Sequence, residues 1–393
     1  MNQPTQRILT THVGSLPRPE RVVTQLFAQD SGLNYVEAEF DRIMAAEVAG
    51  VVGRQVASRV DVVSDGEMGK ISYATYIRHR LTGFELGEMP RAVPKDLDDF
   101  PEFKERLAKL GATPKYQRPI CTGPIAVKDL SGLHKDIANL KAACAASAGP
   151  GAVPLRAFMN SASPGVIAVF LPNKYYASNE QYLQALADAM TTEYEAIVAA
   201  GLDLQIDAPD LAMGRHIKFR DVDDAEFLRN ANLQVDALNH ALRNVPAERV
   251  RMHVCWGNYE GPHHHDIGLE KIIDVVLKAK PATVLFEGAN PRHAHEWEVW
   301  AQAGREGRIP DNKILAPGVL DTVNNFIEHP RLVAQRLLTY ANIVGRDRVM
   351  AATDCGFGTF AGFGAIHPPI CFAKLASMAE GAEIASRQLW STT

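Results

Sequence analysis

Short apolar runs recur along the whole chain, and most are followed by a longer stretch in which apolar residues stand three or four positions apart. The first pattern is typical of buried strands and the second of amphipathic helices. Nine runs predict strands, which end within residues 11–15, 60–67, 118–124, 158–165, 202–209, 249–258, 283–290, 313–321 and 348–356. Residues 179–201 predict one of the helices between them, with Asn179 near its start and Gly201 at its end.

This alternation of strands and helices predicts an α/β protein with a parallel sheet. The number of strands favours a (β/α)8 TIM barrel over an open sheet, although nine candidates compete for eight places. We therefore expect a single barrel domain over residues 1–393. Residues 85–116 are charged and interrupted by proline, and residues 141–155 are rich in small side chains. We interpret these two segments as insertions into the barrel.

Amino-acid composition and net charge exclude several classes of protein. Of the 393 residues 46% are hydrophobic and 22% charged, which is typical of a folded protein. A net charge of −5 gives no positive field for nucleic acid, and no apolar run approaches the roughly 20 residues that span a bilayer. We therefore expect neither nucleic acid nor a membrane as a partner. We expect the protein to be cytoplasmic. Five scattered cysteines without a C-x-x-C pair suit reduced thiols, free to act as ligands or nucleophiles.

The segment HVCWGN carries the most informative chemistry. His253 and Cys255 are two positions apart on an expected strand, so their side chains point to the same side. Cys355 in ATDCGFG and Glu287 in LFEGAN follow other strands. One imidazole, two thiolates and one carboxylate suit tetrahedral zinc, and ligands from distant strands are typical of a catalytic site. The alternative is a buried cysteine beside a histidine of the core.

Acidic residues also follow the strands. Asp65 and Glu67 occur in SDGE, and Asp207 in LQIDAP. The carboxyl ends of barrel strands form the active-site face, so these acids and the zinc candidates are expected at one mouth. The alternative is that each acid caps the following helix. The run His263–His265, followed by Asp266, looks metal-binding, but consecutive residues do not readily converge on one ion, and we interpret it as a solvated active-site loop.

Seven motifs together resemble one family. THVGSLPRP, SDGEMGK, LQIDAP, HVCWGN, LFEGAN, LAPGVLD and ATDCGFG occur in the order seen in the catalytic barrel of cobalamin-independent methionine synthases. The resemblance implies a zinc-dependent methyltransferase in which a zinc-bound thiolate attacks an alkyl donor. It makes His253, Cys255, Glu287 and Cys355 the zinc ligands. It also implies that Ser15, Glu67 and Asp207 hold the amino acid portion of homocysteine, the expected thiol acceptor.

Three features depart from the family pattern. The chain has room only for the catalytic barrel, so a folate donor is less assured. Val323 or Asn324 stands where the full-length enzymes have a histidine that protonates the departing pterin. We expect Lys70 in DGEMGK close to the thiol pocket, where a cation would suit an anionic substrate. These features point to the short single-barrel branch, which resembles both core methionine synthases and epoxyalkane:coenzyme M transferases.

Several alternatives therefore stay open. If the chain is an epoxyalkane:coenzyme M transferase, Lys70, Arg18 or Arg78 would bind the sulfonate of coenzyme M, and its activated thiol would open an epoxide. An alternative from a different class of function is a non-catalytic barrel that binds no metal. A decarboxylase resembling uroporphyrinogen decarboxylase would not need the His–Cys–Cys set, and this chain lacks the arginine cluster suited to many carboxylates. The expected partners are a small thiol and an alkyl donor, and the oligomeric state stays open, a homo-oligomer included.

Overall fold

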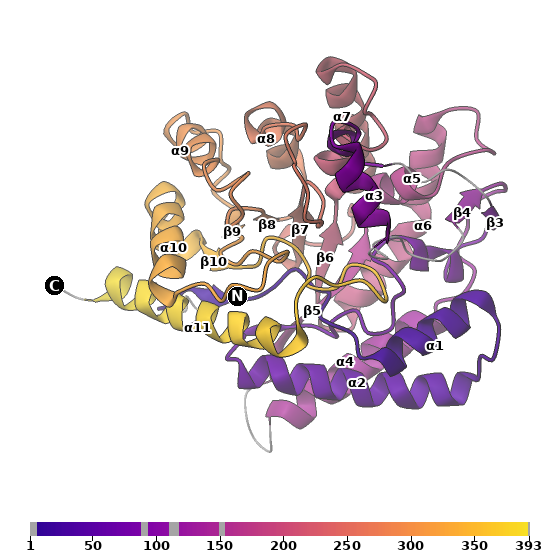
Figure 1. The fold of residues 1–393 in the computed structure, drawn as a ribbon, viewed down its shortest axis with the longest axis horizontal. Helices are drawn as coiled ribbons and strands as arrows, with labels where there is room; N and C mark the ends of the chain where they lie inside the picture. The colour runs from indigo at the N-terminus through magenta and orange to yellow at the C-terminus, as the bar shows by residue number, and fades with distance from the viewer. Residues whose placement is uncertain (1–5, 88–92, 110–117, 149–153, 392–393) are drawn as a thin grey trace.

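The computed structural model describes residues 6–87, 93–109, 118–148 and 154–391. Eight short strands of the described chain pair in parallel, and Figure 1 shows the helices arranged around the strands. They are β1 (Leu9–Thr10), β2 (Val62–Val63), β5 (Arg156–Ala162), β6 (Asp203–Asp207), β7 (Val250–Val254), β8 (Thr283–Phe286), β9 (Ile314–Pro317) and β10 (Met350–Ala351). This arrangement confirms the expected α/β barrel.

Ladder pairing runs in the order β2, β5, β6, β7, β8, β9, and β1 pairs with β10. Bridges between Leu315 and Val349 and between Gly318 and Ala352 join β9 to β10. The amide of Asp61 donates to the carbonyl of Thr10 at 3.2 Å and joins β2 to β1. The ring is therefore closed without a free sheet edge.

Helices follow the strands and cover the outside of the ring (Figure 1). They are α1 (Glu20–Ser31), α2 (Glu37–Ala57), α4 (Ser131–Ala148), α5 (Pro164–Phe170), α6 (Asn179–Ala199), α7 (Asp224–Ala241), α8 (Leu269–Lys278), α9 (Trp297–Arg305), α10 (Pro330–Val344) and α11 (Pro368–Trp390). The one expected over 179–201 is present as α6, with Ser178 rather than Asn179 as its cap, since the Ser178 side chain accepts from the amide of Gln181.

The ninth candidate strand lies outside the ring. Residues Arg118–Cys121 form β4, which pairs antiparallel with β3 (Phe84–Gly87). An apolar run indicates that a segment is extended and buried, but it does not name the partner strand, so the sequence pattern does not separate this hairpin from the barrel strands.

The two expected insertions have different outcomes. Residues 85–116 contribute part of β3, a 3-10 turn at Lys95–Asp98 (η2) and α3 (Pro101–Lys109), and positions 88–92 and 110–116 lie outside the described residues. Residues 141–148, in contrast, belong to α4, which packs on α2. The first half of the expected insertion at 141–155 is therefore a barrel helix, because alanine-rich sequence favours helix as readily as loop; positions 149–153 lie outside the described residues.

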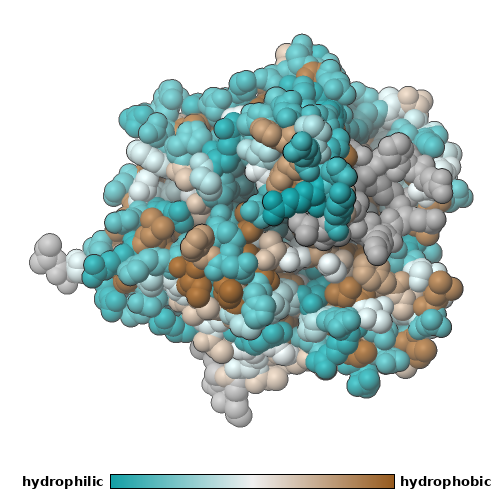
Figure 2. All heavy atoms as spheres, in the orientation of Figure 1, coloured by the Kyte–Doolittle hydropathy of each residue, from teal (hydrophilic) through white to brown (hydrophobic). Residues whose placement is uncertain are grey.

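Two apolar layers hold the ring. Outside the strands, a large core joins them to the helices, and within the ring a smaller cluster contains Val13, Val62, Phe158, Leu285, Ala316, Met350 and Ala352. The visible outer face is mainly hydrophilic, with hydrophobic residues in small groups (Figure 2). In the described part of the chain, no helix is both long and apolar enough to cross a membrane.

Candidate active site and metal centre

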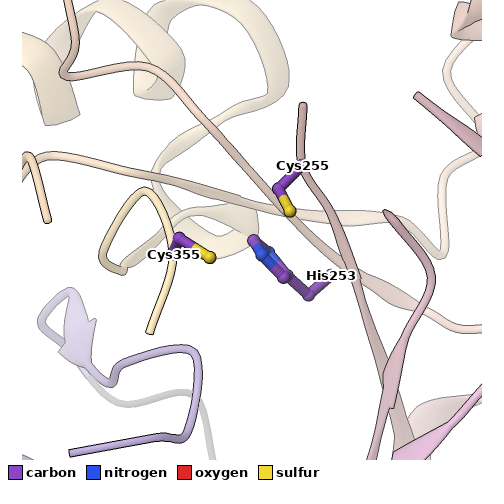
Figure 3. Close-up of side chains that lie close together, drawn as sticks. All are labelled: His253, Cys255 and Cys355. Atoms are coloured by element: carbon purple, nitrogen blue, oxygen red, sulfur yellow. The ribbon is translucent and has the colours of Figure 1, made fainter. Parts of the chain in front are cut away.

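Strand ends bring three soft ligands together. His253 lies on β7, Cys255 follows that strand directly, and Cys355 lies in the loop after β10. Their side chains point toward one another, and the candidate ligand atoms all lie within 4.8 Å of each other (Figure 3). All three residues are buried, with at most 5% of their surface exposed. The predicted convergence of His253, Cys255 and Cys355 is thus present in the structure.

The charges in this cluster depend on one another. A hydrogen bond from Cys355 holds the pKa of Cys255 well below the ordinary value of a thiol, even though burial opposes this. The same hydrogen bond raises the pKa of Cys355. Burial lowers the pKa of His253, but the charges of Cys255, Asp207 and Glu287 outweigh it and raise the pKa. The cluster therefore already favours one thiolate, the form in which cysteine binds metal.

The donor set fits a zinc ion. Within the described residues, neither ring nitrogen of His253 meets the geometry of a hydrogen bond, although both are buried. Buried polar atoms are normally satisfied, and an unsatisfied imidazole beside two sulfurs is typical of a metal ligand. The histidine and both cysteines would hold the ion.

Glu287 lies next to this cluster but has other partners. Its carboxylate accepts from the backbone amide of Trp256 at 2.8 Å and from the side chain of Asn290 at 2.7 Å. Burial and the charge of Cys255 raise its pKa to about 8, although His293 opposes this. Glu287 is not one of the three residues whose ligand atoms lie within 4.8 Å of each other, so a direct bond to the ion stays a prediction.

A cavity of about 420 Å³ opens onto the sulfur cluster. Ser15, Glu67 and Asp207 line it together with the three soft ligands. Asp207 is the register partner of His253 on the neighbouring strand, so acid and imidazole reach the mouth side by side. The remainder of the wall is mostly apolar and includes Tyr73, Phe170, Phe360 and Phe363.

The two acids that line the cavity, Glu67 and Asp207, have raised pKa values. Burial raises the pKa of Glu67 to about 8, and the nearby Asp207 contributes to this rise against the opposing charges of Lys70 and Arg18. Burial likewise raises the pKa of Asp207. Two buried carboxyl groups near each other disfavour their shared ionisation, and a ligand cation would relieve that cost.

The backbone at Gly356 packs closely against Ser15 and fixes its position. A Cβ on Gly356, next to Cys355, would stand 1.9 Å from Ser15 Oγ. The amide of Phe357 donates to the carbonyl of Ser15 at 2.8 Å. The loop after β1 and the loop after β10 are therefore packed together at this point, and only glycine at 356 leaves room for the hydroxyl.

Asp65 and Lys70 lie behind the cavity wall rather than on it. The carboxylate of Asp65 accepts from the amide of Glu67 at 2.9 Å. Lys70 Nζ donates to the carbonyl of Asn160 at 2.5 Å and lies 4.7 Å from the ring centre of Tyr76. Both residues support the pocket from inside the fold.

The basic residues that were expected to bind the sulfonate of coenzyme M also have partners within the protein. Arg18 donates to the carbonyl of Glu67 at 3.0 Å, and Arg78 pairs with Asp30. Neither they nor Lys70 line the cavity. A sulfonate would have to displace these internal contacts, so the arrangement favours an ammonium-bearing thiol.

Asp354 is a positioning residue that sequence reasoning missed. Its carboxylate accepts from the backbone amides of Gly288, Ala289 and Asn290 at 2.8–2.9 Å. It thus ties the loop that carries Glu287 to the loop that carries Cys355. A signal is present in the sequence, since Asp354 precedes Cys355 in ATDCGFG, but its partners lie more than sixty positions away.

His216 is a second missed residue. It follows a 3-10 turn at Met213–Arg215 (η4), lines the cavity and is 1% exposed. Its Nδ1 lies 2.8 Å from Oδ1 of Asp266, although neither ring nitrogen meets the geometry of a hydrogen bond within the described chain. The amide of Met213 donates to the carbonyl of Cys255, which anchors this turn beside the metal cluster. No recognised motif marks this histidine.

Known proteins resemble this chain over its whole length. A methionine synthase of Saccharolobus solfataricus is 24% identical over 387 residues, which cover 97% of this chain and 95% of the relative. A methionine synthase of Thermococcus kodakarensis is 22% identical over 382 residues, with 97% and 94% covered. No family model matches the chain.

Solved structures share the fold. A B12-independent methionine synthase from Shewanella sp. W3-18-1, in complex with selenomethionine, superimposes with a TM-score of 0.73 at 18% identity, covering 98% of this chain and all of that one. A putative vitamin-B12 independent methionine synthase from Listeria monocytogenes gives 0.64 at 15% identity, with the same coverage.

The closed ring and its mouth, together with the whole-length similarity, define an α/β-barrel transferase. The resemblance expected from the seven motifs is confirmed. The chain is similar over its whole length to methionine synthases, and it shares the fold of a solved B12-independent methionine synthase.

Proposed function

We propose that this chain transfers a methyl group to the thiol of homocysteine at a zinc site formed by His253, Cys255 and Cys355. The observation that carries the proposal is that the sulfur cluster and the acidic pair Glu67 and Asp207 share one cavity. Homocysteine has a thiol for the cluster and an ammonium group for the acids. The similarity to methionine synthases over the whole chain supports the same acceptor.

The chain's own residues position the acceptor. Glu67 and Asp207 would bind the ammonium group, which lowers the cost of ionising both buried acids. Ser15 would donate from its hydroxyl to the carboxylate. When bound, zinc would lower the pKa of the thiol and leave its sulfur a nucleophilic thiolate. Glu287 would supply the oxygen ligand of the ion.

His216 is the group best placed to supply a proton to the leaving group. It lines the same cavity, its Nε2 has no partner in the described chain, and Asp266 lies behind its other nitrogen. A carboxylate in this position orients the ring. His216 would thus replace the family histidine that is absent at Val323 and Asn324.

Zinc content and methyl transfer measured in parallel test this proposal. Wild-type protein is expected to hold about one zinc per chain and to form methionine from homocysteine and methyl iodide, a donor that needs no binding pocket. Cys355→Ser is expected to lose both together, because one soft ligand is gone. The control is Cys144→Ser on α4, away from the cavity. Full zinc and full rate in Cys355→Ser would reject the site, and a wild type without zinc would favour the metal-free barrel.

A further inference from the structure

Two consecutive histidines meet a distant aspartate at the edge of the molecule. His264 Nε2 lies 2.8 Å and His265 Nε2 2.7 Å from the same Oδ2 of Asp99. The ligand atoms of all three residues lie within 4.8 Å of each other. Both histidine side chains are 36% exposed, as expected for a solvated loop, and the two consecutive rings meet at one carboxylate oxygen.

We propose that Asp99, His264 and His265 form a second metal site, which takes a divalent transition ion such as zinc or cobalt. Two imidazoles and one carboxylate are the ligand set that these ions prefer, whereas calcium and magnesium require oxygen ligands. Solvent would complete the coordination. The site is separate from the sulfur cluster, and it does not depend on the proposed function.

The local geometry suits an ion. One carboxylate oxygen faces both imidazoles, so a single acceptor takes two donors. Ligand atoms around one tetrahedral ion, with bonds of about 2.1 Å, lie about 3.4 Å apart. The imidazole–carboxylate spacing found here therefore requires only a small shift. Phe100 packs edge-on against the ring of His264, with the ring centroids 5.5 Å apart.

The second site joins two parts of the cavity wall. Asp99 directly follows η2, and this turn and α3 supply Leu97, Lys104, Leu107 and Ala108 to the wall. The histidines belong to the loop after β7, which supplies Tyr259 and Glu260. An ion held by both sides would fasten the η2–α3 segment over the cavity.

Other contacts show that the same two parts already dock. Asp96 on η2 accepts from the hydroxyl of Tyr259 and from the amide of His263. These contacts are made within a few residues of the histidine pair. Metal binding would therefore strengthen an existing arrangement rather than create a new one, and we infer that occupancy stabilises the docked η2–α3 segment against local opening.

Cobalt titration of the metal-free full chain distinguishes the two sites. The sulfur cluster is expected to take one equivalent with sulfur-to-cobalt charge-transfer absorption, and the second site one more equivalent without it. His264→Ala and Asp99→Asn are expected to bind the second equivalent at least about tenfold more weakly, since even loss of an outer partner costs 10–100-fold. His134→Ala, an exposed histidine on α4, is the matched control and should keep both.

Hydrogen exchange tests the proposed consequence. In wild type, the second equivalent is expected to slow exchange over residues 95–109, and in His264→Ala it should not. If wild-type protein binds only the equivalent of cobalt that shows sulfur-to-cobalt absorption, the proposed second site is rejected. A second equivalent that both variants retain would overturn it as well. Unchanged exchange in a doubly loaded wild type would overturn the fastening of the wall.

Discussion

The carboxylate of Asp65 accepts a hydrogen bond from the backbone amide of Glu67, two residues later, at 2.9 Å. Glu67 has a φ of 55°, in the left-handed region that few non-glycine residues adopt. Its carboxyl group reaches the cavity from this conformation. The Asp65 side chain therefore holds a strained backbone turn that aims Glu67, the proposed substrate-binding acid, into the cavity.

Asp65→Ala is expected to weaken binding of the acceptor without removing the metal. Losing the Asp65 carboxylate relaxes the turn, and we expect the KM for homocysteine to rise about tenfold, which corresponds to about 1.4 kcal/mol. Zinc content should stay at the wild-type level. The control is Asp129→Ala, because Asp129 makes the same turn contact with Ser131 far from the cavity. An unchanged KM would show that Glu67 keeps its place without Asp65.

Glu67→Gln is expected to remove a pH-dependent loss of stability. The folded chain raises the pKa of Glu67 from 4.5 to about 8, so it retains a proton that the unfolded chain releases. Stability of the wild type therefore falls as pH rises between these values. Thermal unfolding should show the Gln variant gaining on wild type from pH 5 to pH 8. The exposed Glu380→Gln should show no such trend; a constant difference for Glu67→Gln would contradict the raised pKa.

The same variant should bind homocysteine more weakly while it retains zinc. A neutral amide cannot form an ion pair with the ammonium group, and the neighbouring Asp207 alone would supply the negative charge. Calorimetric titration with homocysteine measures this loss directly. Equal affinity in the variant and the wild type would reject Glu67 as a substrate-binding residue.

Asp354→Ala is expected to loosen the metal centre. Three backbone amides of the Glu287 loop lose their common acceptor, and each unsatisfied buried donor costs about 1–3 kcal/mol. The loop should then move relative to Cys355. The rate at which a chelator removes zinc should rise at least about tenfold. Asp321→Ala, whose carboxylate accepts from Val323 and Asn324 instead, serves as the control.

His216→Gln is expected to slow transfer only from donors whose leaving group needs a proton. Methyl iodide releases iodide, so its rate with homocysteine should change less than about threefold. Propylene oxide, opened by the same thiol, leaves an alkoxide, and its slower rate should fall by about 100-fold, the lower end of general acid catalysis. An equal fall with both donors would make His216 structural.

Local patterns are sufficient to predict much of the site. Residues two apart on a strand share a face, and this spacing correctly predicts that His253 and Cys255 lie together. Strand ends in a barrel share one mouth, and this rule brings Cys355, Glu67 and Asp207 to the same cavity. The orientation of a residue in a turn follows no such period. Lys70 and Asp65 are therefore expected at the pocket surface but lie behind it.

The sequence by itself determined the class of fold and the set of reactive side chains, because periodic burial and turn residues are encoded within a few neighbouring positions. Only the tertiary structure decided which of the nine candidate strands stays outside the ring, since pairing of β4 with β3 rather than with a barrel strand depends on the path of the chain between them. It also decided the partners of Asp354, His216 and Asp99. Each partner lies far along the chain, and contacts of that kind are fixed by how whole elements pack.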